Sequence, residues 1–270
     1  ILQRMQADNA GPLRIEQVTR IFREIIASCL ALEESLGIAY LGPAGTFSQE
    51  ATFKHFGQGV ATLPVESIPQ IFQAVESGKV RYGVVPVENT TEGVIAQTLD
   101  TFVTSPLKIC GEISLRIHQN LMCAHQDWQA VQTVYSHAQS LAQCRHWLDK
   151  HLPQAERIPV SSNAEAARLA SLEPEAAAIG SIQAAGIYQL QVVHESIEDN
   201  PNNTTRFWII ADQDVGISGK DRTSIIVSAK NQPGSLYHML KPLAENGVDM
   251  SRIESRPSKT TNWEYLFFLD

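Results

Sequence analysis

The feature that most constrains the fold is a repeated unit between residues 38 and 210, in which a short apolar run precedes a helix start. Four helix starts, beginning at Thr46, Ser67, Ser136 and Ser162, show Ser/Thr-x-x-Gln/Glu spacing. In this capping box the first and fourth side chains satisfy free amides of the first helical turn. Strands alternating with such helices predict an α/β fold built on mostly parallel sheets.

The longest extended segments predict how the chain is divided. Short strands are expected at 38–41, 60–65, 82–87, 131–135 and 176–179, whereas 107–117 and 120–124 form one long extended stretch. Such a stretch in an α/β chain is typical of a crossing between two lobes, and 191–197 provides a return. We therefore expect two α/β lobes with a cleft between them. Ligands of such sheets bind where strands end and helices begin.

The segments on either side have different patterns. Apolar positions at helical spacing over residues 14–36 predict one long helix. Residues 211–221 are polar and predict a linker. Beyond it, a strand (223–229), a helix (233–246) and two strands (248–255 and 263–269) predict part of a small α+β sandwich that lacks its last helix and strand. We expect the chain to be a piece of a longer polypeptide.

Composition excludes several classes of function. Acidic residues outnumber basic ones by 29 to 21 and no Lys/Arg cluster stands out, so nucleic acid is not an expected partner. The sequence contains no run of 18 apolar residues, so no membrane span is predicted. No signal-peptide pattern is present, and the four cysteines lack metal-binding spacing, which indicates a reducing, cytoplasmic environment. We expect no metal and no cofactor.

The residues Thr204, Thr205, Arg206 and Phe207 lie where a polar turn becomes an apolar strand. Arg206 offers a planar fork of donors suited to a carboxylate. The Thr205 hydroxyl can donate and accept a hydrogen bond at once. This pair suits an anionic substrate that loses or gains a proton-bearing oxygen. The alternative is an ordinary surface turn that leads into a core strand.

Several motifs in order resemble one family. Residues 42–48 (GPAGTFS), 86–93 (PVENTTEG), 136–139 (SHAQ) and 205–207 (TRF) are similar to the successive signatures of prephenate dehydratase, over residues 38–211. Residues 234–236 (GSL) and 254–257 (ESRP) resemble the two phenylalanine-binding motifs of an ACT regulatory domain, here 222–270. Residues 1–37 resemble the last helix of an AroQ-type chorismate mutase. Together these segments resemble the bifunctional chorismate mutase–prephenate dehydratase family, truncated at both ends, with Ala138 where proline is usual.

The resemblance implies a fold, an activity and a set of site residues. The implied fold is a two-lobed, periplasmic-binding-protein-like dehydratase domain with an incomplete ACT domain. The implied activity is the decarboxylating dehydration of prephenate to phenylpyruvate in L-phenylalanine biosynthesis, with feedback regulation by L-phenylalanine. Thr205 is the implied catalytic hydroxyl. Substrate-binding residues are Gly45, Thr46, Asn89, Thr90, Ser136, Gln143, Thr204, Arg206 and Phe207, and effector-binding residues are Gly234, Ser235, Leu236, Glu254, Ser255, Arg256 and Pro257.

Some alternatives remain open at this point. Arg206 can be a structural ion pair, Asn89 and Thr90 can start a helix near 94–102, Ser136 can cap its helix, and Gln143 can face solvent. The whole chain can be a non-catalytic two-lobed amino-acid binding or sensor protein, because such a protein has the same fold. We expect a homo-oligomer formed through the ACT and dehydratase domains. We also expect weak or absent phenylalanine inhibition of this chain, inhibition of the full-length protein, and no chorismate mutase activity from residues 1–37.

Overall fold

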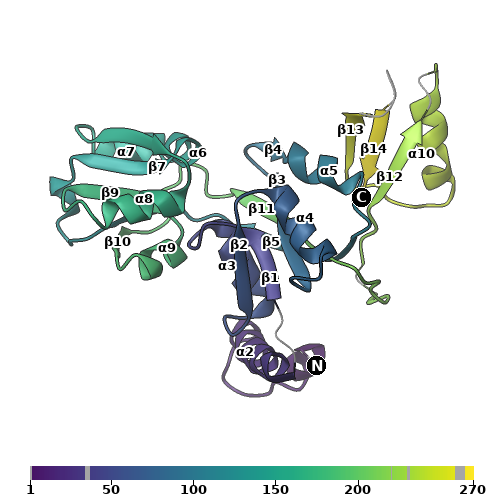
Figure 1. Ribbon diagram of the computed structural model, residues 1–270, viewed down its shortest axis with the longest axis horizontal. Helices are drawn as coiled ribbons and strands as arrows, with labels where there is room; N and C mark the ends of the chain where they lie inside the picture. Colours follow the sequence, from purple (N-terminus) through teal and green to yellow (C-terminus); the bar gives the residue numbers. More distant parts are fainter. Residues whose placement is uncertain (1, 34–36, 220, 230–231, 259–264) are drawn as a thin grey trace. The chain divides into compact units, whose positions relative to one another are not determined.

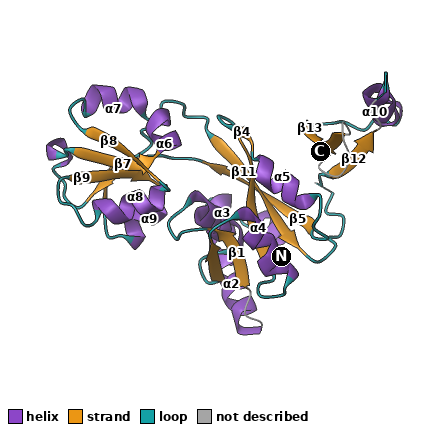
Figure 2. Cartoon of the chain, turned by 45° about the horizontal axis from the view of Figure 1, so that its top comes forward, coloured by secondary structure: helices purple, strands orange, loops and turns teal. Residues whose placement is uncertain are grey.

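The computed structural model describes residues 2–33, 37–219, 221–229, 232–258 and 265–270. The chain divides into two compact units, Ile1–Gln213 and Asp214–Asp270 (Figures 1 and 2). The first unit contains two α/β lobes and the leading helices. The second is a small α+β unit.

The first lobe is built on a mixed sheet in the order β2-β1-β3-β11-β5, with β4 paired to β3. Three helices, α3 (Phe47–Phe56), α4 (Ile68–Glu76) and α5 (Ala96–Phe102), pack on this sheet. Its strands are β1 (Gly37–Leu41), β2 (Ala61–Val65), β3 (Tyr82–Asn89), β4 (Gly93–Val94), β5 (Lys108–Arg116) and β11 (Thr204–Ala211).

The second lobe has a five-stranded sheet in the order β10-β6-β9-β7-β8. Helices α6 (Ala138–Gln143) and α7 (Arg145–His151) cover one face, and α8 (Asn163–Ala170) and α9 (Ile182–Ile187) cover the other (Figures 1 and 2). Its strands are β6 (Asn120–Cys123), β7 (Thr133–His137), β8 (Glu156–Val160), β9 (Ala176–Gly180) and β10 (Gln191–His194), and a 3-10 turn, η1, spans Trp128–Ala130.

Two segments join the lobes, as the sequence predicts. The chain leaves the first lobe between β5 and β6 and returns between β10 and β11. The prediction of mostly parallel sheets is wrong. β1 pairs in parallel with β2 and β3, but β11 is antiparallel to both β3 and β5. The returning strand enters the sheet from the opposite end, which reverses its direction.

Period-two burial on the strands produces a core on each face of the second sheet. Leu121 and Ile179 pack with the α7 residue Leu148 in one cluster. Met122 and Ala178 pack with α8 and α9 residues in the other. Small alanines on β9 and α8 allow the helix to pack closely on the strand.

Among the described residues none of the four predicted capping boxes forms in full, and only one makes its Ser/Thr cap bond. Ser162 accepts a hydrogen bond from Glu165 N, as predicted. Thr46 and Ser67 precede their helices but make no side-chain cap bond. The prediction for Ser136 is wrong, because the helix begins one residue later and His137 is its cap. Ser136 instead lies in β7 with its side chain buried.

Two helices precede the lobes. The predicted long helix is α2 (Ile15–Glu33), and its predicted end at 34–36 lies outside the described residues. A short helix that the sequence did not predict, α1 (Leu2–Ala7), packs against it. Glu24 of α2 accepts a hydrogen bond from Gln58 N, just beyond α3. No helix in the described part of the chain is both long and apolar enough to cross a membrane.

The second unit is the predicted βαββ arrangement. It consists of β12 (Ile225–Ala229), α10 (Ser235–Glu245), β13 (Ile253–Pro257) and β14 (Tyr265–Leu269), with β14 in the centre of an antiparallel sheet. The first two residues of the predicted last strand, 263 and 264, lie outside the described residues.

Candidate active site

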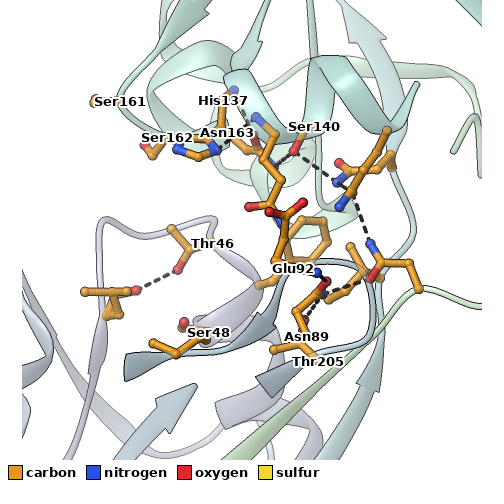
Figure 3. A pocket seen from close by; sticks show the side chains of 18 of the residues that line it. Thr46, Ser48, Asn89, Glu92, His137, Ser140, Ser161, Ser162, Asn163 and Thr205 are labelled. Carbon is orange, nitrogen blue, oxygen red and sulfur yellow. Dashed lines mark hydrogen bonds between the residues drawn. The ribbon is translucent and has the colours of Figure 1, made fainter. Parts of the chain in front are cut away.

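A cavity of about 420 Å³ lies between the two lobes of the first unit. Figure 3 shows Thr46, Asn89 and Thr205 on the side of the first lobe, and Ser140 and Asn163 on the side of the second. The volume is in the range of small-molecule sites. The cavity is bordered by the strand ends and helix starts at which the sequence predicts ligand binding.

Strand register brings Asn89 and Thr205 together. β3 and β11 are antiparallel, and Thr205 is the partner of Asn89 in this pairing. The following turn is fixed by Thr90 N, which donates to Thr204 O at 3.0 Å, and by Thr204 N, which donates to Thr90 Oγ1 at 3.0 Å. Asn89 and Thr205 are 7% and 8% exposed. Two residues 116 positions apart therefore form one rigid corner of the cavity.

The hydrogen bonds of Asn89 determine what Thr205 can do. Asn89 Oδ1 accepts from the backbone amides of Thr91 (2.9 Å) and Glu92 (3.2 Å). Because an amide N–H only donates, the Asn89 side chain has one possible orientation. Its Nδ2 donates to Thr205 Oγ1 at 2.8 Å. Thr205 is therefore an acceptor in this bond, and its own hydrogen makes no bond to any described residue.

A row of amides continues from this corner into the second lobe. Asn89 Nδ2 also donates to Asn203 Oδ1 at 2.8 Å. Asn203 Nδ2 donates to Gln143 Oε1 at 3.0 Å. Gln119 Nε2 donates to the same Gln143 oxygen at 3.2 Å. The row runs along one wall of the cavity and joins strand ends of the first lobe to α6.

The start of α3 supplies donors on the opposite wall. Thr46 Oγ1 donates to Leu41 O at 2.9 Å rather than capping the helix. Gln49 Oε1 accepts from Gly45 N at 2.7 Å. The first-turn amides at Thr46 to Ser48 therefore have no side-chain cap. Such amides, with the positive end of the helix dipole, favour an anion.

Gly45 permits the two lobes to approach each other. Its φ is +91°, and a Cβ there would lie 3.1 Å from Ala184 Cα in α9. Its carbonyl accepts a hydrogen bond from Ser181 Oγ at 2.7 Å. A residue with a side chain would separate the loop from α9. Gly45 therefore lies at a close contact between the two lobes.

The charged groups of the lining are few. Among the described residues that line the cavity, Glu66 and Glu92 are acidic, His137 is the titratable base, and none is Lys or Arg. His137 Nδ1 accepts from Gln139 N at 3.4 Å, which leaves Nε2 as the ring donor in the neutral tautomer. An anion in this cavity would be bound chiefly by neutral hydrogen-bond donors.

The structure brings together only some of the predicted substrate-binding residues. Thr46, Asn89, Gln143 and Thr205 line the cavity, and Gln143 faces the other lobe rather than solvent. The remaining predicted residues do not line it, namely Gly45, Thr90, Ser136, Thr204, Arg206 and Phe207. Phe207 is a core residue of the first lobe. Ser136 is buried and contacts Ile179 O and Asn163 Oδ1.

Arg206 corresponds to the alternative of a structural ion pair. Its side chain is 15% exposed and lies 3.2 Å from Glu112 and 3.8 Å from Glu88. It follows Thr205 on β11, and adjacent strand residues point to opposite faces of a sheet. The hydroxyl and the guanidinium that suggest one site in the sequence therefore lie on different faces.

Several lining residues were not predicted from the sequence, among them Gln119, Ser140, Asn163, Asn203, His137 and Ser48. Asn203 lies within the polar turn that ends at Thr205, and Asn163 follows a predicted helix cap, so both lie next to predicted features. Gln119 had no signal. It lies in the crossing segment between β5 and β6, and no local pattern distinguishes it.

The predicted effector residues lie in the second unit. Gly234 has φ +83° and is the N-cap of α10, which begins at Ser235. Ala229 of β12 and Pro257 of β13 are both opposite Tyr265 of β14. The motif at the start of α10 therefore follows the end of β12, and the motif 254–257 includes the end of β13. The two strand ends lie at the same end of the sheet.

No group of three or more His, Cys, Asp or Glu side chains in the described ranges is arranged to hold a metal ion. The cysteines are free thiols, and burial raises the pKa of Cys110, Cys123 and Cys144. A raised pKa disfavours the nucleophilic thiolate.

Comparisons with known proteins identify both units. Residues 38–215 match the family "Prephenate dehydratase", and 223–270 match "ACT domain". The bifunctional chorismate mutase/prephenate dehydratase of Pseudomonas aeruginosa is 51% identical over all of this chain and 74% of its own length. The structure of prephenate dehydratase from Arthrobacter aurescens in complex with L-Phe is 32% identical, with a TM-score of 0.75 over 86% of this chain and 79% of that one. A quorum quenching acylase, GqqA, is 26% identical with a TM-score of 0.78, covering 86% of each chain.

Proposed function

The chain belongs to the prephenate dehydratase family and carries an ACT domain, and we propose that it converts prephenate to phenylpyruvate with Thr205 as the proton donor. The first unit performs the chemistry. The second unit binds L-phenylalanine and regulates the first.

The reaction releases carbon dioxide and water from prephenate. The bond from the ring to its carboxylate breaks, and its electron pair enters the ring as the bond to the ring hydroxyl breaks. The departing oxygen takes a proton and leaves as water, and the ring becomes aromatic. Aromatisation provides the driving force, so the protein has to orient the substrate and protonate the leaving oxygen.

The observation that carries the proposal is the fixed orientation of Asn89. Because Asn89 Nδ2 donates to Thr205 Oγ1, the Thr205 hydrogen is directed elsewhere and is available to the substrate hydroxyl. The same Asn89 amide stabilises the negative charge that develops on Thr205 Oγ1 as the proton leaves. Solvent water then returns the proton. General acid assistance of this kind contributes about 10²–10⁴-fold.

The two carboxylates of prephenate are bound by neutral donors. The uncapped first turn of α3, at Thr46 and Ser48, accommodates one carboxylate. The wall containing Gln143 accommodates the other. Glu92 also lines the cavity, and a carboxylate there weakens the binding of a dianion unless it lies away from both charges.

Regulation is assigned to the second unit. Gly234 is the N-cap of α10 and has no Cβ beside the first helical turn, and the motif 254–257 lies in β13 of the same unit. Phenylalanine bound there changes activity by favouring one arrangement of the lobes, to the extent that its affinity differs between them. We infer that the protein is a cytoplasmic homo-oligomer in which ACT units pair.

Two other functions have less support. A non-catalytic amino-acid sensor has no use for a hydroxyl held with its hydrogen free in a buried corner. An acylase site of the Ser–His–carboxylate type needs a His base that meets the nucleophile through one ring nitrogen and the orienting carboxylate through the other. Ser196, His118 and Glu198 lie together in the described part of the chain, but they do not form such a triad. Ser196 Oγ and the Glu198 carboxylate both contact the same ring nitrogen, Nδ1 of His118, at 3.0 and 3.2 Å.

The test is direct. The protein is incubated with prephenate, in buffer with a metal chelator, and phenylpyruvate formation is followed. Steady production proportional to protein concentration supports the proposal. Unchanged prephenate in the presence of folded protein contradicts it, and binding without turnover would support the sensor alternative.

A further inference from the structure

We propose that Gln119 is a positioning residue that joins the hydrogen-bond networks of the two lobes and holds the Gln143 amide group in its substrate-binding orientation. The inference rests on the proposed function, because it assigns Gln143 to a carboxylate of the substrate. Gln119 itself acts through Gln143.

The orientation of each amide in the first-lobe network follows from one backbone anchor. Asn89 is fixed by the amides of Thr91 and Glu92. Asn203 must then accept with Oδ1 and donate with Nδ2. Gln143 must therefore accept with Oε1, and its Nε2 points the other way. Any further partner of Gln143 Oε1 has to be a donor.

A second anchor lies in the other lobe. Asn163 Oδ1 accepts from the backbone amide of His137 at 3.0 Å, which fixes this side chain as well. Asn163 Nδ2 then donates to Ser140 Oγ at 2.9 Å. Ser140 Oγ is 3.0 Å from Gln119 Nε2, and it accepts from this group too. The first-lobe network thus ends in the acceptor Gln143 Oε1 and the second-lobe network in the acceptor Ser140 Oγ, and both lie within reach of one donor.

Gln119 lies between these two acceptors and can donate a hydrogen bond to each of them. Its Nε2 has two hydrogens, one for Ser140 Oγ and one for Gln143 Oε1. The side chain is 2% exposed. Its backbone is held by Glu198, whose carboxylate accepts from Gln119 N at 2.9 Å, and by Ile197 N, which donates to Gln119 O at 2.8 Å. The donor is thus anchored where the two crossing segments meet.

The consequence concerns two atoms that have no partner among the described residues. Gln143 Nε2 and Gln119 Oε1 are buried without a hydrogen bond. An unsatisfied buried amide is costly, and such groups occur where a ligand completes them. The Gln143 side chain lines the cavity while its Nε2 is buried without a protein acceptor, so an anionic oxygen seated against this side chain would complete the donor. Gln119 keeps this donor there by occupying the Gln143 oxygen.

The test uses Gln119→Met, which removes both donors at similar length, and Gln119→Glu, which places an acceptor against acceptors. Gln154→Glu, an exposed site in the same lobe, is the matched control. We expect Gln119→Met to raise KM for prephenate about tenfold, as for a lost hydrogen bond, with kcat within about threefold of wild type. Gln119→Glu should show the same rise in KM at high pH. KM should recover as pH falls, because a protonated carboxyl can donate one bond, and its burial among acceptors raises its pKa.

A pH-independent, wild-type KM in Gln119→Glu overturns the inference, as does a Gln119→Met variant with unchanged KM. Thermal unfolding of each variant checks folding, and if Gln119→Glu does not fold then Gln119→Met decides alone. Failure of the two proposals is distinguishable. A wild-type protein that leaves prephenate unchanged overturns both. A wild type that is active, a Thr205→Ala variant that is not, and Gln119 variants that behave as wild type overturn only this inference.

Discussion

The cavity of the first unit and the effector motifs of the second differ in how completely the chain builds them. In the first unit, buried Asn89 and Thr205 are fixed by strand register, by the two backbone amides that bind Asn89 Oδ1, and by the bond between their side chains. In the second, Leu236 and Tyr237 are 44% and 64% exposed, and no described residue of α10 is buried. The residues around Thr205 are held by bonds within the first unit, whereas the exposed start of α10 can be completed by another surface. This difference supports the proposal that ACT units pair around phenylalanine.

Among the residues around Thr205, the largest effect is expected when the hydrogen-bond donor of Asn89 is replaced by an acceptor. Asn89→Asp keeps the shape but makes the side chain an acceptor, so the Thr205 hydroxyl donates to it instead of to the substrate. We expect kcat to fall about 100-fold, in the range of a lost general acid. Asn202→Asp makes the same change at an exposed site nearby and should have little effect. Equal kcat values for the two variants would remove the assigned role of Asn89.

An intermediate effect is expected for substitutions at the predicted phenylalanine-binding residues of the second unit. Gly234→Val introduces a β-branched residue at φ +83° beside the effector motif, and Glu254→Ala shortens the facing residue. Each should raise the phenylalanine concentration for half-inhibition about tenfold, within the usual range of coupling energies. Gly247→Val strains a left-handed glycine at the other end of α10 and is the control. If the control relieves inhibition equally, the cause is unfolding rather than loss of the site.

A smaller effect is expected in the acid stability of the first lobe. Burial, with a smaller contribution from the nearby Arg23 charge, lowers the pKa of His55 in the first lobe from 6.5 to about 4. Below pH 6.5 the unfolded chain takes up a proton that the folded lobe refuses until near pH 4, so stability falls across this window. Because the ring is partly exposed, we expect a loss of about 1 kcal/mol. His55→Gln should flatten the dependence in denaturant titrations between pH 7 and 4, and an unaltered slope would contradict the assignment.

The smallest effect is expected at Arg206. Arg206→Lys keeps a cation for Glu88 and Glu112 on the face of β11 away from the cavity. KM for prephenate should change less than about twofold, because the guanidinium lies on the other face of the strand and does not line the cavity. A large rise in KM would instead restore Arg206 as a carboxylate clamp, which is the first of its two interpretations from the sequence.

The sequence predicts those regions whose structure depends on residues close together in the chain, and it does not predict contacts between distant residues. The lobes, the crossings and the βαββ unit follow from short periodic segments and their order. Thr205 and Asn89, which line the cavity, could be selected from the sequence because each lies in a motif. Gln119 and Ser140 were not, because their roles depend on hydrogen bonds across 21 to 24 residues that no local pattern encodes. Arg206 was grouped with Thr205 because adjacency in sequence hides the alternation of a strand.

The most direct test of Thr205 as the proton donor compares Thr205→Val with Thr205→Ser. Valine has the same shape without a hydroxyl, and serine keeps the hydroxyl next to Asn89. Prephenate binding is measured at equilibrium, and phenylpyruvate formation in a single turnover. We predict that valine preserves binding within a few-fold and lowers the rate at least 100-fold, while serine retains much of the rate. A valine variant that forms phenylpyruvate at the wild-type rate would contradict the account.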